Sequence, residues 1–332
     1  MSNGYVPITI TNNQSTATGT NFQQLLNINM DNYSSYLNSD LSNVYFSSDT
    51  AGANVIDSWL ESGNSNTSTS TIFWVLLPNG IGANSSITIY MQIDLSGASH
   101  FNNTTTGEAP QLSGTYAEYD NGTTVFIFYD NFSGTSLSSK WTVATNATAT
   151  VNNGVTVGLA SGQNWYGIYT SSFTTSSAIA DTYAKDNGGS NSGFDIATDG
   201  VAYEENSGHS PSIWYFNEGG TVSSSPTSGG NSSSTNPPVS GTLYLFSAVI
   251  ISGSPLIQVS YTTYVSGTYS ITTPTAIGLG TSAGNTAFFQ WARARLVPPN
   301  NTMPSISEGS IVIPDTPTIV STTSPIYEVM TW

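Results

Sequence analysis

Short runs of alternating apolar and polar residues recur along almost the whole chain, and this recurrence most constrains its fold. Examples are YVPITIT (5–11), TIFWVLL (71–77) and SSITIYMQI (85–93), separated by clusters rich in Gly, Ser, Asn and Thr. A period of two turns one face of a strand toward a core and the other toward solvent. Helical periodicity is nearly absent. The pattern predicts an all-β protein made of antiparallel, jelly-roll-like β-sandwiches.

The pattern changes along the chain, and the changes predict its domain organisation. Residues 1–95 hold one series of strands and form an N-terminal β-sandwich, and residues 96–124 are poor in alternation and connect it to the next unit. Residues 125–309 hold a second series and form a second sandwich. In residues 310–332, short β-prone runs are separated by prolines, which cannot donate to a sheet, so this segment is an extended tail.

The charge of the chain excludes some partners. Lysine and arginine together number 4 against 20 acidic residues, which gives a formal net charge of −16. A nucleic-acid binder needs basic residues to neutralise phosphates, so nucleic acid is excluded. Membrane insertion is not expected, because no apolar run approaches the length of a membrane span. The start, MSNGYVPITIT, shows no signal peptide, and the chain has no cysteine for a disulfide.

Two stretches resemble known modules. The N-terminal stretch combines PITITN, the pair Trp59 and Glu61, and a run from Trp74 to Met91. It resembles a β-sandwich module of unknown function that opens archaeal and bacterial surface proteins. The stretch FYDNFSGTSLSSKWTV and the later QWARARLVPPNNTMPSISEG resemble the opening and closing parts of a concanavalin or laminin-G-like jelly roll. These resemblances imply an architecture and leave function open, because such modules serve many roles.

Both arginines of the chain lie two residues apart in the predicted closing strand of the second sandwich. The spacing places Phe289, Trp291, Arg293 and Arg295 on one face of that strand. One interpretation is structural: each arginine stacks on an aromatic ring or pairs with an acidic residue. The other is that Arg293 and Arg295 form a basic spot on an acidic surface and contact an acidic glycan or a partner's carboxylate.

Adjacent aromatic residues are further candidates for ligand contact. Trp165 and Tyr166, and likewise Trp214 and Tyr215, put one ring outward whichever face of the strand is buried. An exposed ring can stack on a sugar, and the neighbouring hydroxyl and amide groups can supply hydrogen bonds. The alternative is that these rings belong to a core or to an interface.

The sequence predicts that the protein is not an enzyme. Concanavalin-like folds include glycoside hydrolases, which need two carboxylates. The chain offers Glu118 and Asp120 in the right order, but Thr123 stands where a second glutamate is required. No cofactor and no metal site is predicted, except that clustered loop oxygens allow calcium. The acidic residues considered for calcium are Asp181, Asp186, Asp195 and Asp199.

Asparagine carries a frequent motif. Asn-x-Ser/Thr is the acceptor for N-linked glycans, and most of its occurrences fall in predicted loops. The candidate glycosylation sites are Asn13, Asn32, Asn66, Asn84, Asn102, Asn103, Asn121, Asn131, Asn146, Asn231 and Asn300.

The tail is expected to serve assembly. Its apolar residues could add as strands to the edge of a neighbouring subunit, although the tail could instead cover an edge of its own chain. The residues expected to be buried on docking are Ile311, Ile313, Ile319, Ile326 and Val329.

These observations together predict a structural surface protein, located on a virion or outside a cell. The first hypothesis is a virion surface or spike protein, in particular of an archaeal virus, that can attach to host glycans. The second is a subunit of an extracellular adhesive filament joined by donor strands, and the third is a carbohydrate-binding adhesin. The expected partners are further coat or filament subunits and cell-surface glycans.

Overall fold

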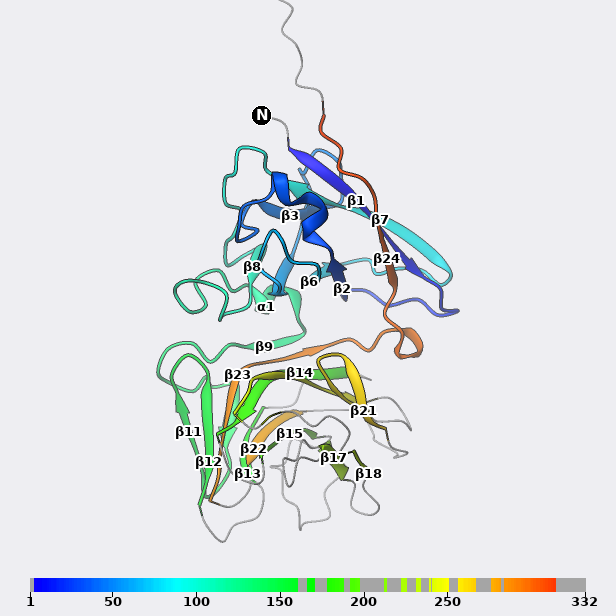
Figure 1. The fold of residues 1–332 in the computed structure, drawn as a ribbon. Helices are drawn as coiled ribbons and strands as arrows, with labels where there is room; N and C mark the ends of the chain where they lie inside the picture. The colour runs from blue at the N-terminus through cyan, green and yellow to red at the C-terminus, as the bar shows by residue number, and fades with distance from the viewer. Residues whose placement is uncertain are drawn as a thin grey trace, which may run out of the picture.

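The computed structural model describes residues 3–160, 166–170, 178–187, 192–197, 212–213, 222–225, 231–233, 239, 241–250, 256–266, 276–281 and 284–314. Strands dominate its regular structure, and nearly all of their pairings are antiparallel (Figure 1). The prediction of an all-β protein built from antiparallel sandwiches is therefore confirmed. Among the described residues, no helix is long and apolar enough to cross a membrane.

The first sandwich consists of two sheets. One contains, in spatial order, β24 (Ser305–Glu308), β1 (Gly4–Asn12), β7 (Ser85–Ile93), β3 (Val44–Ser47) and β4 (Val55–Ile56). The other contains β2 (Phe22–Ile28), β6 (Thr71–Leu77), β5 (Ser58–Ser62) and β8 (Thr106–Glu108). A 3-10 helix, η1 (Met30–Tyr36), follows β2.

The second sandwich also has two main sheets. The larger one contains β11 (Ala147–Val151), β12 (Val155–Leu159), β23 (Thr286–Arg295), β14 (Ala178–Asp186), β19 (Tyr244–Ile250), β20 (Leu256–Val259) and β21 (Thr262–Ser266), with β9 (Phe128–Asp130) also paired to β23. The other contains β10 (Trp141–Val143), β13 (Tyr166–Thr170), β22 (Ala276–Thr281) and β15 (Ser192–Ala197). The remaining elements are β16 (Ser212–Ile213), β17 (Val222–Ser225), β18 (Asn231–Ser233), α1 (Gly122–Val125) and η2 (Pro299–Asn301).

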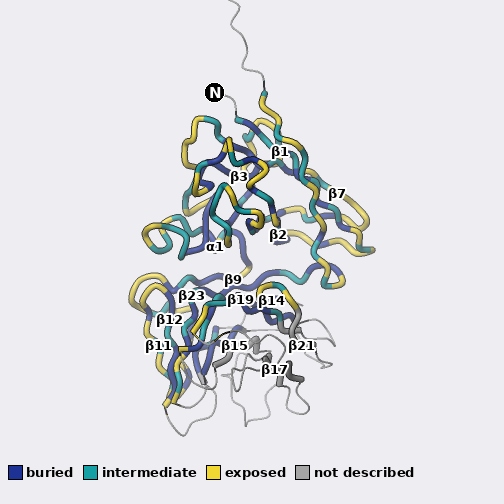
Figure 2. The backbone as a smooth tube through the Cα atoms, viewed as in Figure 1, coloured by how far each residue is buried: buried dark blue, intermediate teal, exposed yellow. Residues whose placement is uncertain are grey.

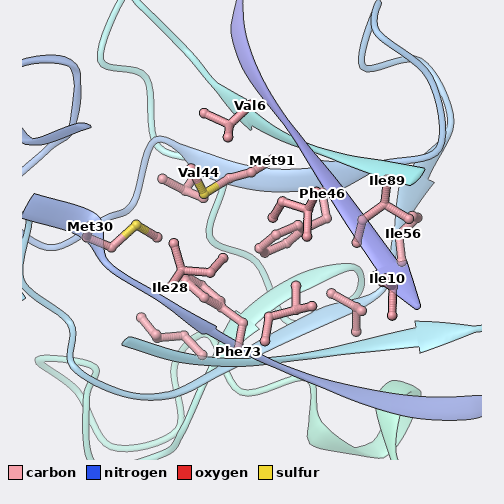
Figure 3. Packing of buried hydrophobic residues seen from close by; sticks show 14 of the residues in the cluster. Val6, Ile10, Ile28, Met30, Val44, Phe46, Ile56, Phe73, Ile89 and Met91 are labelled. Carbon is pink, nitrogen blue, oxygen red and sulfur yellow. The ribbon is translucent and has the colours of Figure 1, made fainter. Parts of the chain in front are cut away.

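The core of the first sandwich follows from the alternation seen in the sequence. In β1, every second residue is buried, so that Val6, Ile8 and Ile10 point inward. The paired strand β7 turns Ile89 and Met91 to the same side, opposite Ile8 and Val6. Figure 3 shows how these side chains meet those of the facing sheet. The buried members of this cluster are chiefly Ile, Leu, Val and Phe side chains.

The closing segment of the chain belongs to the first sandwich. After the second sandwich ends, β24 runs back alongside β1 (Figure 1), where Ile306 lies opposite Ile10. Beyond it, Val312 pairs with Tyr5. The expected domain boundary at residue 309 therefore lies too late, because residues 305–308 complete a sheet of the first sandwich.

The expected connecting region also contributes to the fold. Within residues 96–124, β8 pairs in parallel with β5 of the first sandwich. The chain then passes through α1 into β9, which pairs with β23 of the second sandwich. The buried strands β9, β14 and β23 lie on the side of the second sandwich that faces the first (Figures 1 and 2). The two sandwiches therefore meet over a buried surface, which we call the junction.

Candidate functional site

Strand β23 supplies the centre of the junction. Its Ala292 and Ala294 pack in the core of the second sandwich. Trp291, Arg293 and Arg295 point the other way and contact residues of the first sandwich. The strand therefore separates a small-residue inner face from an outer face that carries both of the chain's arginines.

A β-bulge decides which aromatic residue of β23 reaches the junction. Trp291 lies opposite Tyr183 of β14, but the next pairing joins Phe289 to Ala184, so Gln290 is an extra residue in β23. An extra residue interrupts the alternation of a strand. Phe289 consequently packs in the core of the second sandwich, and the prediction that it shares a face with Trp291 is wrong.

Arg293 connects the two sandwiches directly. Its side chain is fully buried, and its Nε donates to Oδ2 of Asp181 in β14 at 2.7 Å. Its Nη2 lies 2.7 Å from Oε2 of Glu61, which belongs to β5 of the first sandwich. A charge taken out of water needs such partners, because desolvation of an unpaired ion is expensive.

The second arginine completes a neutral set. Arg295, also buried, donates from Nε to Oδ2 of Asp181 at 2.8 Å. The four groups Glu61, Asp181, Arg293 and Arg295 thus comprise two carboxylates and two guanidinium groups, and their formal charges cancel. We call these four residues the ion cluster.

Aromatic rings enclose the ion cluster. The guanidinium carbon of Arg293 lies 4.6 Å from the ring centroid of Phe126, 4.7 Å from that of Trp74 and 4.9 Å from that of Trp291. That of Arg295 lies 4.8 Å from the ring centroid of Trp74. Rings at this range attract a cation through their negative faces. The rings also keep water away, which strengthens each ion pair inside.

The carboxylate of Glu61 accepts further hydrogen bonds. Trp74 Nε1 donates to its Oε2 at 2.8 Å, and the hydroxyl of Tyr261 donates to its Oε1 at 2.6 Å. Trp74 belongs to the first sandwich and Tyr261 follows β20 of the second. Directional bonds from both sides therefore fix the carboxylate at the junction.

The protonation states of the cluster follow from these contacts. Burial acts to raise the pKa of Asp181, but the guanidinium groups of Arg295 and Arg293 outweigh it and hold that pKa below its ordinary value. Burial acts to lower the pKa of Arg293, but the carboxylates of Glu61 and Asp181 outweigh it and raise that pKa. Burial, and next the charge of Glu61, raise the pKa of Tyr261. Asp181 and Arg293 therefore stay charged at neutral pH.

A cleft with a cavity volume of about 580 Å³ opens beside the ion cluster, between the two sandwiches. Its walls come from both sandwiches and from the segment that connects them. Its lining includes Asn27, Glu61, Ser62, Ser70, Gln111, Tyr183, Tyr244, Ser260, Tyr261 and Trp291. Cavities of roughly 300–1,000 Å³ are typical of small-molecule sites.

The structure places the predicted ligand-contact residues in different surroundings. Arg293 and Arg295 are buried in the ion cluster rather than exposed, so the geometry fits their structural interpretation and not a basic spot on the surface. Trp165, Trp214 and Tyr215 lie outside the described residues, as does the side chain of Tyr166.

The residues considered for calcium do not come together as a site in the described part of the chain. Asp181 is engaged by two arginines, and one oxygen of Asp186 accepts from the backbone N–H of Gly241 at 3.0 Å. Asp199 and the side chain of Asp195 lie outside the described residues. No group of three or more metal-ligating side chains occurs among the residues that were placed.

The described part of the tail folds back on its own first sandwich. Ile311 packs partly buried against the aliphatic core, whereas Ile313 is 43% exposed. Ile319, Ile326 and Val329 lie outside the described residues.

The candidate glycosylation sites fall into groups. Asn121 is buried, so its side chain is not accessible to a glycosylating enzyme. The structure therefore removes Asn121 from the candidates. The amides of Asn66, Asn102 and Asn131 donate hydrogen bonds within the protein. The exposed candidates are Asn13, Asn32, Asn84, Asn103, Asn146 and Asn300, while the side chain of Asn231 lies outside the described residues.

Sequence reasoning found the arginines but not their partners. Trp59, Glu61 and Trp74 were noticeable as motif residues, yet nothing in the sequence assigned them to a junction. Tyr183 and Tyr261 carried no signal, since an isolated tyrosine in a β-rich chain is unremarkable. A buried arginine requires a carboxylate, but the sequence does not say which of many it meets.

Comparison with known proteins supplies one sequence relative. No protein-family model matches the chain. A protein of Sulfolobus islandicus rod-shaped virus 1, called Uncharacterized protein 562, is 46% identical to it over 124 residues, which is 37% of this chain and 21% of that protein. The matched stretch therefore spans only about a fifth of the viral protein.

Solved structures that align with about half of the chain include binding modules and enzymes. The carbohydrate binding module CBM66 of Bacillus subtilis aligns with a TM-score of 0.35 and 11% identity, over 47% of this chain and 95% of its own. An endo-β-galactosidase from Clostridium perfringens aligns with 0.40 and 12%, over 51% and 62%. The catalytic domain of a laminarinase from Thermotoga petrophila aligns with 0.38 and 9%, over 51% and 96%.

These alignments correct one prediction. The sequence predicted that the protein is not an enzyme, but the aligned structures include glycoside hydrolases beside a binding module. The prediction is withdrawn.

Proposed function

We propose that the protein is a surface component of a virus particle and that it attaches to host glycans. The observation that carries the proposal is the 46% identity to a protein of a rod-shaped virus over 124 residues. Identity at this level over such a length indicates common descent of the matched stretch. The proposal extends that relationship to a place on the particle.

The chemistry of the chain supports an exposed location. Charged residues make up 7% of the chain, and hydroxyl and amide side chains take their place on the surface. The exposed asparagine motifs, among them Asn13, Asn84 and Asn103, lie in loops between strands where attached glycans would not disturb the sheets. We also propose that the native protein is a glycoprotein, with glycans attached at some of these exposed asparagines.

Labelling of purified particles tests the location. Antibodies raised against the folded protein are applied to intact virus particles from the natural source and detected with gold in the electron microscope. Gold on the particle surface, with the protein present by mass spectrometry, is the expected result. Antibodies against a host ribosomal protein serve as the control. A protein found in infected cells but absent from washed particles would refute the proposal.

The alternative, a filament subunit joined by donor strands, is favoured by one observation. The edge of β1 accepts β24 from the far end of the same chain, with Thr9 opposite Ser307. Exchange of this segment between copies would join subunits into a chain. The same exchange could involve residues 315–332, which lie outside the described residues.

A disulfide trap separates closure within one chain from exchange between chains. The chain has no cysteine, so the double variant T9C/S307C carries only the designed pair. Assemblies formed by the double variant are oxidised and run on a non-reducing gel. A monomer band indicates closure within the chain. A ladder of covalent oligomers indicates donor-strand exchange. The single variants T9C and S307C control for random cross-linking.

A further inference from the structure

The cleft beside the ion cluster has an aromatic floor. Tyr183 and Trp291, neighbours across β14 and β23, stack with ring centroids 5.9 Å apart and an angle of 18° between their planes. Tyr261 continues the floor toward Trp74. Trp291 is only 1% exposed and supports Tyr183 from within, so the accessible part of the floor belongs to the partly buried Tyr183 and Tyr261. Rigid rings of this kind lose little conformational entropy on binding.

The rim of the cleft is polar. Asn27, Ser62, Ser70 and Ser260 line it and are exposed. Ser70 donates to Oδ1 of Asn27 at 3.0 Å, so two of these groups already form a small network across the rim. Hydroxyl and amide groups both donate and accept, and they therefore match a ligand that is itself rich in hydroxyl groups.

Two buried polar atoms of the lining residues lack hydrogen-bond partners. These are Oε1 of Gln111 and Nε1 of Trp291, one acceptor and one donor. An unsatisfied buried polar group is unfavourable and is uncommon in proteins. Gln111 is only partly buried, so a turn of its amide can offer that oxygen to a molecule in the cleft.

The electrostatics of the cleft select against ionic ligands. Its carboxylate, Glu61, is neutralised by Arg293 and bonded to Tyr261. The ion cluster as a whole is neutral, so it offers no net attraction to an anion or a cation. The net charge of −16 adds a repulsion for anions.

From this combination we infer that the cleft binds a short neutral saccharide. The apolar face of a sugar ring packs on Tyr183 and Tyr261, while its hydroxyl groups exchange hydrogen bonds with Asn27, Gln111 and the rim serines. The inference rests on the proposed attachment to glycans for its biological meaning and assigns that attachment to the junction. It also gives the junction a second role besides holding the sandwiches together.

Titration of the purified full chain tests the inference without virus particles. Maltose, cellobiose, lactose and mannobiose are the neutral probes, and sialyllactose is the anionic comparison. Isothermal titration and tryptophan fluorescence follow binding. At least one neutral probe is expected to bind saturably with a Kd of about 1 mM or tighter, and sialyllactose more weakly than lactose.

Variants locate the site. Ser62→Trp places a large side chain at the exposed rim, and Tyr183→Ala removes part of the floor; each is expected to weaken binding about tenfold or more. Tyr90→Ala, at a half-buried tyrosine of the first sandwich that packs against Tyr5, is the matched control and should leave binding unchanged. Thermal unfolding checks that each variant is folded. If Tyr183→Ala does not fold, the effect of Ser62→Trp on binding alone tests the location of the site.

Three results would overturn the inference. They are no saturable binding of any neutral probe, binding that Ser62→Trp leaves unchanged, and tighter binding of sialyllactose than of lactose. Because the proteins are pure, these results are independent of particle labelling: labelled particles without saccharide binding would reject the cleft and leave the virion location intact.

Discussion

Phe73 and Trp74 are neighbours in β6, yet they lie in two different kinds of interior. Phe73 points into the apolar core of the first sandwich (Figure 3), where its ring packs edge-on against that of Phe46. Trp74 points into the junction, where it stacks on Arg293 and donates to Glu61. One strand thus presents an apolar face to its own core and a hydrogen-bonding face to the other sandwich.

The two interiors are stabilised by different interactions, apolar burial in the core and ion pairs with hydrogen bonds at the junction. Burial of aliphatic groups is non-directional and tolerates changes that conserve volume. Ion pairs and hydrogen bonds in a dry interior demand a particular geometry and leave a costly unpaired group when one member is lost. The apolar cores therefore stabilise each sandwich, and the junction determines how the two sandwiches are oriented relative to each other.

The largest contrast is expected between Asp181→Asn in the junction and Met91→Leu in the core. Asp181 accepts from both arginines, so its neutralisation leaves two buried cations without their shared partner and is expected to lower the free energy of unfolding by about 3–5 kcal/mol. Met91→Leu conserves volume and is expected to cost less than about 1.5 kcal/mol. Urea denaturation measures both. Equal losses in the free energy of unfolding would show that the junction and the core do not differ in this way.

A smaller contrast is expected within β6 itself. Trp74→Phe keeps a ring near Arg293 but removes the donor to Glu61, and a hydrogen bond to a charged group contributes about 1.5–3 kcal/mol. Phe73→Leu changes only apolar packing and should cost about 1.5 kcal/mol or less. The comparison also separates orientation from folding: small-angle scattering should change for Trp74→Phe and not for Phe73→Leu.

The individual strands could be predicted because their signal is local. Alternation in residues 71–77 and 85–93 marks β6 and β7 with the bounds found in the structure. A period of two needs only neighbouring residues to be recognised. The same holds for the all-β class, which follows from many such runs.

The junction could not be predicted because it depends on distant partners. Arg293 meets Glu61 across more than two-thirds of the chain, and β24 pairs with β1 at its opposite end. Alternation does not encode which edge a strand joins. The bulge at Gln290 had no sequence mark either, since no glycine or proline stands there, and it moved Phe289 to the other face.

The closing segment offers a third, smaller test of the first sandwich. The hydroxyl of Tyr33 in η1 lies 3.0 Å from Oε2 of Glu308 at the end of β24. Tyr33→Phe is expected to cost about 1 kcal/mol, because it removes this contact and the one to the carbonyl oxygen of Gly309 while keeping the ring in the core. Tyr36→Phe in the same helix, at a tyrosine that is 40% exposed, is the matched control and should be neutral. A cost equal to the control would mean that this bond does not hold the closing strand.

The smallest expected effect is a difference in pH dependence between the buried Asp181 and the partly buried Asp120. Arginines lower the pKa of Asp181 below 3.8 against the effect of burial. Burial is the largest influence on Asp120, and it raises the pKa of that carboxyl above 3.8 despite hydrogen bonds from Tyr129 and Asn131. A lowered pKa contributes stability that is complete above the unfolded value and is lost as the pH falls through the folded value. A raised pKa does the opposite: stability declines as the pH rises from the unfolded value through the folded one.

The two asparagine variants should therefore respond to pH in opposite directions. The stability deficit of Asp181→Asn relative to wild type should shrink as the pH falls below about 3.8, because acid removes from the wild type the interaction that the variant already lacks. Asp120→Asn resembles the protonated carboxyl, so its stability relative to wild type should be more favourable at about pH 7 than at about pH 4. Urea titrations of the three proteins across this range give the differences, in which the other carboxylates cancel. If the stability differences of the two variants change with pH in the same direction, the arginines do not set the pKa of Asp181 apart from that of Asp120, and the prediction is wrong.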